Sequence, residues 1–331
     1  MHHPTIGGLL ASASSTAAAG PLVRSWLRRR QRFDHPNERS SHTVPTPRGG
    51  GLACAVGGTI GALVSRTLDG SPTANWVGSS VVLGSIGRAD DVAGLATLPR
   101  LGAQVLTGAL VGIRVGGPFG TAVGAVAVPS IVNAFNFMDG INGISGGTAA
   151  AWGAIVASDP SLSQSARVQG AIAAGMGLGF LPYNVPSASM FLGDIGSYLL
   201  GAGIAVTVIE SAFTNGRPDP RNAARALAPL APYLADTGST IVRRAMRGVA
   251  VTEAHREHAY QKLVHETGWP HWAVSVLVAS ASAASGIAAR TRRGFLPVAP
   301  IAILYLASPT LARLAGPRVG EPEPTAFKGR S

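Results

Sequence analysis

The sequence is poor in charged residues, and this shortage excludes whole classes of protein. Asp, Glu, Lys and Arg together make up 13% of its 331 residues, about half of the roughly 25% that is typical of soluble domains. Too few charges remain to cover a large soluble surface. Hydrophobic residues, at 46%, are also too many for a disordered chain.

Cysteine and lysine are scarce as well. Cys54 is the single cysteine, which rules out a disulfide within the chain and a cysteine-rich zinc site. Only Lys262 and Lys328 among the 27 basic residues are lysines, and the net charge is +11. We interpret this as a compositional bias and expect no nucleic-acid partner, because nucleic-acid binders usually cluster their charge on one face.

Apolar stretches, by contrast, recur along the whole chain. Eleven stretches of ten or more residues lack Asp, Glu, Lys and Arg: 1–23, 49–65, 70–87, 101–113, 115–138, 140–158, 168–193, 195–209, 226–235, 267–289 and 294–312. A membrane-spanning helix needs about 20 mostly apolar residues, and several stretches reach this length. We therefore predict an all-α, polytopic integral membrane helix bundle with about eleven transmembrane helices, or ten as the alternative.

The order of charges predicts how this bundle sits in the membrane. A basic cluster, Arg24 to Arg32, follows the first stretch, which is the wrong order for a cleaved signal peptide and places the N-terminus outside. Alternation from there puts 18 of 27 basic and 12 of 16 acidic residues on the cytoplasmic side. Carboxylates at membrane depth usually pair, bind ions or act chemically, so we predict one site on the cytoplasmic face.

The acidic residues fall into short motifs at the ends of apolar stretches. Asp90 and Asp91 are adjacent and can hold Mg²⁺ or supply a base, although an isolated pair is more often a solvated helix cap. Asn136 and Asp139 lie three residues apart, on one face of a helix. The glycines that follow let the backbone turn towards a ligand; a glycine-capped polar helix end is the alternative.

The third acidic motif has glycines on both sides of its carboxylate. Asp194 follows Gly193 at the start of an apolar stretch, where it can cap a helix or bind a metal beside backbone N–H groups that face a phosphate. Asn184 is expected to line the same opening. Further upstream, Arg48 precedes three glycines and offers a cation and free N–H groups to an anion, without the pattern of a P-loop.

The densest polar run lies over residues 255–262. His255 and His258 share a face if the segment is helical, and this spacing alone also suits zinc. Mg²⁺ with an anionic substrate fits the neighbouring Arg256 and Lys262 better, because Mg²⁺ prefers hard oxygen ligands. An amphipathic surface helix is the alternative.

Taken in order, five motifs resemble those of the polyprenyl-phosphate N-acetylhexosamine-1-phosphate transferases, the superfamily that includes phospho-N-acetylmuramoyl-pentapeptide transferase. They are DHPNERSSH (34–42) with PTPRGGG (45–51), DD (90–91), NAFNFMDG (133–140), FLGDIGS (191–197) and HREHAYQK (255–262). The resemblance covers about residues 20–275 and is closest to the O-antigen-initiating UDP-GlcNAc:undecaprenyl-phosphate GlcNAc-1-phosphate transferase branch.

The resemblance implies both the reaction and its residues. A UDP-N-acetylhexosamine, by default UDP-GlcNAc, and polyprenyl phosphate give polyprenyl-diphospho-sugar and UMP. The family motifs imply Asp90, Asp91 and Asp139 as catalytic residues and Asp194 and Asn136 as metal ligands. The implied substrate-binding residues are Asn142, Asn184, Arg48, His255, Arg256 and His258. Asn142 stands where many bacterial members carry an Asp that contacts uracil, and an amide also pairs with a uracil edge.

The remaining expectations concern cofactor, setting and rival functions. The resemblance implies Mg²⁺, with Mn²⁺ as a substitute, and the inner membrane of a bacterium, with a homodimer left open. We expect one transmembrane catalytic domain over residues 1–313 and a mobile cytoplasmic tail over 314–331. A polytopic transporter with a cytoplasmic anion site is the alternative, but it predicts two related halves, and the sequence shows no convincing repeat.

Overall fold

The computed structural model describes residues 3–36, 42–70, 73–249, 256–291 and 295–316, which form a helical bundle. The helices are α1 (His3–Arg29), α2 (Gly51–Asp69), α3 (Ala74–Ala93), α4 (Thr97–Met138), α5 (Ile144–Ser158), α6 (Gln164–Phe180), α7 (Gly193–Ser211), α8 (Pro220–Leu227), α9 (Ala231–Met246), α10 (Ala259–Thr267), α11 (His271–Ala289) and α12 (Val298–Leu314). Short 3₁₀ turns are η1 (Leu181–Tyr183) and η2 (Ala228–Leu230). Two small antiparallel ribbons pair β1 (Phe33–Asp34) with β2 (Thr46–Pro47), and β3 (Phe213–Thr214) with β4 (Arg217–Pro218).

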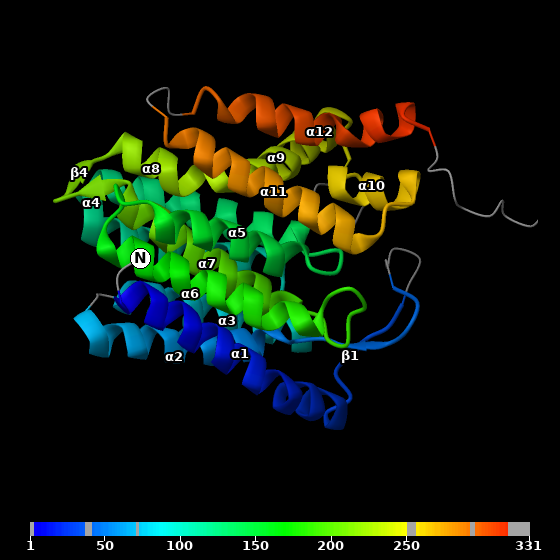
Figure 1. Cartoon of the computed structure of the whole chain (residues 1–331), viewed down its shortest axis with the longest axis horizontal. Helices are drawn as coiled ribbons and strands as arrows, with labels where there is room; N and C mark the ends of the chain where they lie inside the picture. Colours follow the sequence, from blue (N-terminus) through cyan, green and yellow to red (C-terminus); the bar gives the residue numbers. More distant parts are fainter. Residues whose placement is uncertain (1–2, 37–41, 71–72, 250–255, 292–294, 317–331) are drawn as a thin grey trace, which may run out of the picture.

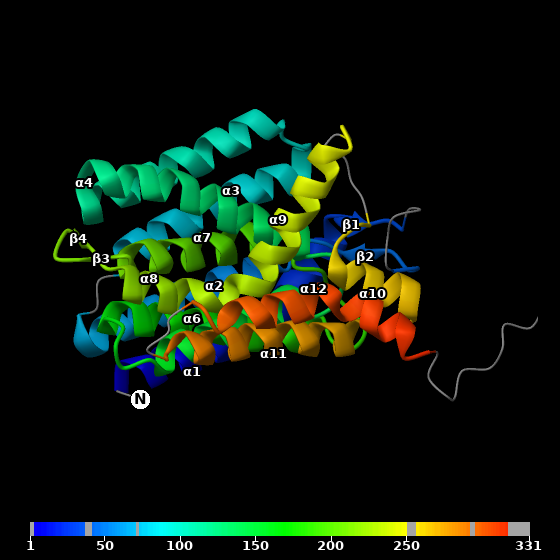
Figure 2. The ribbon, with the colours of Figure 1, turned by 90° about the horizontal axis from the view of Figure 1, so that it is seen from above.

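The long helices lie side by side along the longest axis of the molecule (Figures 1 and 2). The N-terminus and the β3–β4 ribbon mark one end of the bundle, and β1, β2 and α10 mark the other. Helix α7 runs through the middle, where it packs against α3 and α4 on one side and α2 and α6 on the other. Nearly all of its residues are buried. The predicted all-α membrane bundle is confirmed.

Each of the eleven charge-free stretches corresponds to a helical segment. Stretches 101–113 and 115–138 are the two arms of α4, and the weakest, 226–235, spans the junction of α8, η2 and α9. Among the described residues, five helices are long and apolar enough to cross a membrane by length and composition: α1, α2, α4, α7 and α11. That the other segments also cross stays a prediction.

Helix α4 is a hairpin whose arms touch backbone to backbone. Gly116 and Gly117 leave the helical conformation, the latter with φ of 58°, so the chain reverses there. A Cβ on Gly112 would lie 1.9 Å from the carbonyl oxygen of Gly120, and one on Gly108 would lie 2.0 Å from that of Gly124. Glycine at these positions is what allows the two arms to pack so closely.

Candidate active site

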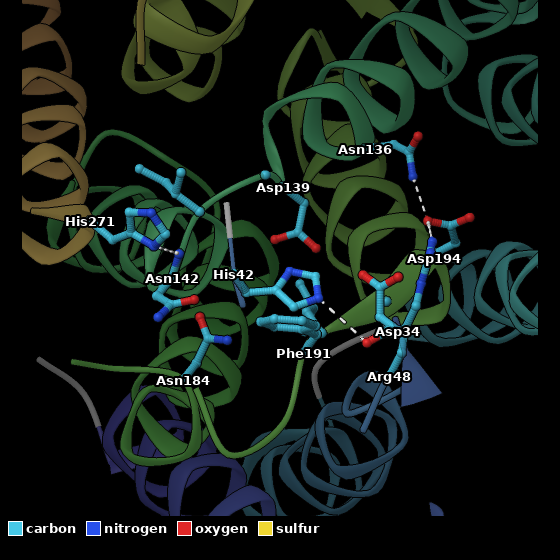
Figure 3. A pocket seen from close by; sticks show the side chains of 14 residues that line it. Asp34, His42, Arg48, Asn136, Asp139, Asn142, Asn184, Phe191, Asp194 and His271 are labelled. Atoms are coloured by element: carbon cyan, nitrogen blue, oxygen red, sulfur yellow. Dashed lines mark hydrogen bonds and ion pairs between the residues drawn. The ribbon is translucent and has the colours of Figure 1, made fainter. Parts of the chain in front are cut away.

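A polar cavity opens at the end of the bundle that carries β1 and β2. It has a volume of about 400 Å³. Of the residues predicted from the sequence, those that line it are Arg48, Asn136, Asp139, Asn142, Asn184 and Asp194. They come from the β2–α2 segment, the end of α4, the loop after α6 and the start of α7 (Figure 3). Segments far apart in sequence therefore meet at one site.

Arg48 joins two of the predicted acids. Its Nε lies 2.9 Å from Asp91 Oδ1, and its Nη2 lies 2.9 Å from Asp194 Oδ1. The following glycines hold Arg48 in place, because Gly49 and Gly50 both donate their backbone N–H to the carbonyl of Phe191. Arg48 thus neutralises part of the negative charge gathered here, and its side chain stays 38% exposed to an incoming anion.

Asp91 caps α7, so Asp194 is not needed as a cap. The backbone N–H groups of Asp194 and Ile195 donate to the two carboxylate oxygens of Asp91, at 3.0 and 3.1 Å. Helix α3 comes this close because Gly87 has no side chain: a Cβ there would lie 2.3 Å from the Asp194 carbonyl oxygen. The alternative interpretation of Asp194 as the helix cap is therefore wrong, and its carboxylate faces the cavity.

Asp90 makes different contacts from its neighbour Asp91. It pairs with Arg100 and accepts the backbone N–H of Leu95 at 2.8 Å. Arg100 lines a mostly apolar cavity of about 520 Å³ between the arms of α4 and α9. Other residues lining it are Leu101, Pro129, Phe137, Leu234 and Ile241. The adjacent acids therefore pair with arginines that line two different cavities, Asp91 with Arg48 of the polar one and Asp90 with Arg100 of the apolar one.

Asn136 and Asp139 lie at the end of α4. The Asn136 amide donates to Asp194 Oδ1 at 3.0 Å and to Ser197 Oγ at 3.2 Å, so it orients Asp194. Asp139 follows the last helical residue, and removal from water raises its pKa to about 7. The charge of Asp194 adds to this rise in the pKa, whereas Arg48 opposes it. Asp139 is thus an acid that changes charge near neutral pH.

The far wall of the cavity is built from amides and a histidine. Asn184 is buried, accepts the Gly143 N–H at 2.6 Å and donates to the Met190 carbonyl at 3.1 Å; it shapes the wall. Asn142 donates its amide to the Pro186 carbonyl at 3.1 Å, and its backbone N–H donates to His271 Nδ1 at 3.4 Å. His271 also lines the cavity.

Several lining residues were not predicted as site residues, among them Asp34, His42, Phe191 and His271. Asp34 and His42 belong to a quoted motif, so the sequence did carry a signal for them. His42 meets the ring of Phe191 edge-on, with centroids 4.8 Å apart. His271 lies outside every motif, at the first position of α11, and no local pattern marks it.

The polar run after α9 is only partly described. His255 lies outside the described residues, and Arg256 is exposed. His258 is buried beside Asp236, with Nδ1 and Oδ1 3.1 Å apart, and it does not line the polar cavity. The predicted substrate contacts of these three residues stay predictions.

The side chains that line the polar cavity offer oxygen ligands that suit Mg²⁺. No group of three His, Cys, Asp or Glu side chains among the described residues is arranged to hold a metal. Mg²⁺ in enzymes is commonly held by only one or two carboxylates together with substrate phosphates and water. Asp194 and Asp139 both present carboxylate oxygens to the cavity, and this hard, thiol-free set fits Mg²⁺ rather than zinc.

Comparisons with known proteins identify the family of the chain. The family model for glycosyl transferase family 4 matches residues 74–212, which run from α3 to α7. Decaprenyl-phosphate N-acetylglucosaminephosphotransferase from Mycobacterium tuberculosis is 30% identical over 322 residues, covering 82% of this chain and 78% of that protein. The protein of the same name from Mycobacterium leprae is 31% identical over 318 residues, with 82% and 79% covered.

A third relative comes from outside the mycobacteria. Undecaprenyl-phosphate alpha-N-acetylglucosaminyl 1-phosphate transferase from Escherichia coli is 31% identical over 178 residues, covering 50% of this chain and 46% of that protein. Motifs, fold and relatives agree: the chain is a membrane enzyme of glycosyl transferase family 4, the polyprenyl-phosphate N-acetylhexosamine-1-phosphate transferases.

Proposed function

We propose that this protein transfers N-acetylglucosamine 1-phosphate from UDP-GlcNAc to polyprenyl phosphate and releases UMP, which starts a lipid-linked glycan of the cell envelope. The observation that carries the proposal is that the adjacent Asp90 and Asp91 pair with arginines that line two cavities of opposite character. Asp91 contacts Arg48 and the start of α7 at the polar cavity, and Asp90 contacts Arg100 at the apolar one.

The polar cavity is proposed to bind the UDP-sugar. Arg48 offers a cation to the diphosphate, and Asn142 and His271 offer polar groups to the base or the sugar. Asp194, Asp139 and Asn136 would hold Mg²⁺, although the Asn136 amide nitrogen now faces Asp194 and would have to turn. When bound, Mg²⁺ supplies positive charge to the phosphates of the transferred group.

The apolar cavity is proposed to bind the first isoprene units of the lipid. Leu101, Phe137 and Ile241, which line it, are 38–40% exposed, so a lipid chain can enter from the membrane. Arg100 pairs with Asp90 and lies 3.3 Å from the Tyr198 hydroxyl. A lipid in this cavity would place its phosphate beside Arg100.

The transfer needs an attack of one anion on another. An oxygen of the lipid phosphate forms a bond to the phosphorus that carries the sugar, and the bond to the bridging oxygen breaks, so that UMP leaves with the electron pair. The lipid phosphate is mostly ionised at neutral pH, and the role of Asp90 and Asp91 is therefore to position it and its arginine partners. Arg48 neutralises charge as the substrates meet.

The orientation is also a proposal. The last turn of α1, at the polar end of the bundle, contains Arg28 and Arg29, and basic residues favour the cytoplasmic side. We infer that the protein lies in a bacterial inner membrane with both cavities near the cytoplasmic face, where UDP-sugars are available.

A transfer assay tests the function. Membranes containing the protein receive undecaprenyl or decaprenyl phosphate and a panel of radiolabelled UDP-N-acetylhexosamines, with Mg²⁺, with Mn²⁺ or with chelator. Label that moves into the lipid phase only with a divalent ion, together with release of UMP, supports the proposal. Label that is taken up into sealed vesicles without reaching lipid would instead support the transporter.

A further inference from the structure

A fully buried carboxylate outside both cavities holds the start of α10. Asp236 of α9 is 0% exposed. Its two oxygens accept the backbone N–H of Ala259 at 3.0 and 2.9 Å, and Oδ1 also lies 3.1 Å from His258 Nδ1. The hydroxyl of Tyr305, from α12, donates to Oδ2 at 2.8 Å. Since a buried carboxylate is costly without such partners, these bonds fix α9, α10 and α12 to one another.

Tyr260 connects this cluster with the polar cavity. Its ring stacks on His258, with centroids 5.7 Å apart, and its hydroxyl donates to the Phe137 carbonyl at 3.1 Å. The ring needs the space at Gly140, where a Cβ would lie 2.2 Å from the Tyr260 hydroxyl oxygen. Residues 137–140 form the turn that carries Asp139. The start of α10 therefore braces the backbone that positions an acid of the site.

Ion pairs also attach the same segment to the end of α9. Glu257, directly before His258, contacts Arg244 of α9 at 2.6 Å and also pairs with Arg247, the residue that follows α9. Two consecutive residues of the polar run are thus attached to α9, one through an ion pair and one through Asp236. Buried hydrogen-bond networks of this kind impose one arrangement rather than many.

We propose that Asp236 is a positioning residue of the active site. It fixes the first turn of α10, which presses Tyr260 against the 137–140 turn and so sets the place of Asp139. Its kinetic consequences rest on the proposed function, but the mechanical connection from Asp236 to the turn does not.

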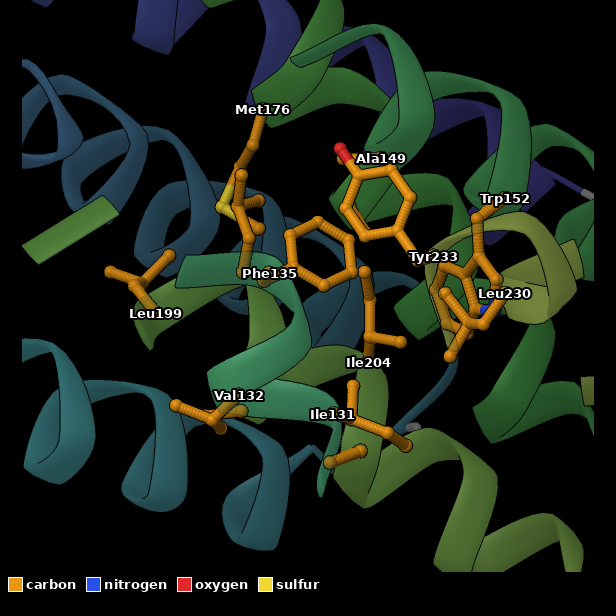
Figure 4. Packing of buried hydrophobic residues seen from close by; sticks show 14 of the residues in the cluster. Ile131, Val132, Phe135, Ala149, Trp152, Met176, Leu199, Ile204, Leu230 and Tyr233 are labelled. Carbon is orange, nitrogen blue, oxygen red and sulfur yellow. The ribbon is translucent and has the colours of Figure 1, made fainter. Parts of the chain in front are cut away.

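Hydrogen–deuterium exchange on the purified, full-length protein in detergent tests the mechanical connection. Tyr305→Phe removes one hydrogen bond to Asp236 with little change of shape. We expect faster exchange of the backbone amides at 259–263 and at 139–143. Tyr233→Phe is the matched control: Tyr233 is also 0% exposed and packs on Phe135 with ring centroids 4.9 Å apart (Figure 4), but within the described part of the chain its hydroxyl has no hydrogen-bond partner. Unchanged exchange at 139–143 in Tyr305→Phe would overturn the proposal.

A double-mutant cycle tests the effect on catalysis. We expect Asp236→Asn and Tyr260→Phe each to lower kcat roughly tenfold, less than the ~100-fold that a 1 Å misplacement can cost, with little change in the KM for UDP-GlcNAc. Because both act through one contact, the double variant should be no slower than the slower single variant. Effects that multiply, as for two independent sites, would contradict the proposal.

Two controls separate the possible failures. Activity is divided by the amount of monodisperse protein, so a variant that merely folds poorly keeps its normal kcat. If Asp236→Asn does not fold, Tyr305→Phe replaces it in the cycle. A wild-type protein without transferase activity would refute the proposed function, while the exchange result would still decide whether Asp236 braces the turn.

Discussion

At the residue scale, the site divides its work among acids that the sequence presents as alike. Asp91 caps α7, so the Asp194 carboxylate is not needed as a cap. It faces the cavity, with Arg48 and Asn136 beside it. An acid with a free oxygen next to a helix N-terminus is well placed to hold a metal against a diphosphate.

Asp194→Asn should therefore leave the fold intact and remove most of the activity. The amide keeps the shape but is a weak metal ligand, and several kcal/mol of lost transition-state stabilisation correspond to a rate on the order of a thousandfold lower. Turnover per purified enzyme measures this. Asp219→Asn is the control, because Asp219 caps α8 through Asn222 and Asn caps equally well. If Asp194→Asn kept more than about a tenth of wild-type turnover, Asp194 would not be a metal ligand.

Asp139 should make substrate binding depend on pH. Its pKa of about 7 lies above the ordinary value, so the side chain is neutral below pH 7 and becomes a carboxylate as the pH rises through 7. Mg²⁺-dependent binding of UDP-GlcNAc should accordingly tighten from pH 6 to pH 8. Calorimetry measures the affinity for UDP-GlcNAc at each pH. Lipid is left out because the lipid phosphate itself titrates near pH ~6. Asp139→Asn should flatten the profile; an unchanged slope would assign the titration to another group.

The sequence indicated the acids but not their division of labour. Motif spacing placed Asn136, Asp139 and Asp194 at helix ends, and all three line one cavity. The contacts that give each a role join residues 103 and 146 positions apart, and no local pattern encodes such pairs. Asp90 and Asp91 were treated as a pair, yet neighbours on a helix point about 100° apart, and they pair with arginines of different cavities.

At the element scale, the positions of the glycines in α4 determine its hairpin shape. Arg114 separates two apolar stretches, and two glycines follow it, so a break was predictable. The direct contact between the arms was not, because it depends on glycines that face each other across the turn. Helix α10 was expected only conditionally, since its sequence is polar and its stability comes from the Asp236 cap.

Gly112→Ala should destabilise the protein by about 1–3 kcal/mol, as overpacking does, because the new methyl group would meet the Gly120 carbonyl. Thermal unfolding in detergent measures the effect. Gly102→Ala in the same arm is the control: its Cβ would meet nothing within 4 Å, and alanine favours a helix by roughly 1 kcal/mol over glycine. Equal thermal unfolding midpoints for the two variants would show that the two arms of α4 are free to separate.

At the scale of the whole molecule, polar groups concentrate at one end of an otherwise apolar bundle. The apolar stretches predicted the bundle because membrane helices must be apolar along their length. The order of motifs predicted that the acids would meet, since alternate crossings bring every second loop to the same side. What remained hidden was the depth and shape of the two cavities, which packing alone decides.

The orientation predicts opposite labelling at the two ends. In a background of Cys54→Ala, whose cysteine is buried, an introduced cysteine at His35 near β1 should react with a membrane-impermeant maleimide only after the cells are opened. One at Ser161, between α5 and α6, should react in intact cells. Both residues are exposed at their surface. Labelling of both positions from outside would contradict the proposed topology.

The adjacency of Asp90 and Asp91 has a consequence for inhibitors. Consecutive Cα atoms are only 3.8 Å apart, so the carboxylates that pair with Arg48 of the polar cavity and with Arg100 of the apolar cavity sit on neighbouring residues. A compound that joins a uridine-like head to a short isoprenoid tail through a compact, charge-bearing linker should occupy both cavities at once. Tethering makes the second contact intramolecular, so its affinity should far exceed that of either half, and lengthening the linker should steadily erode that gain.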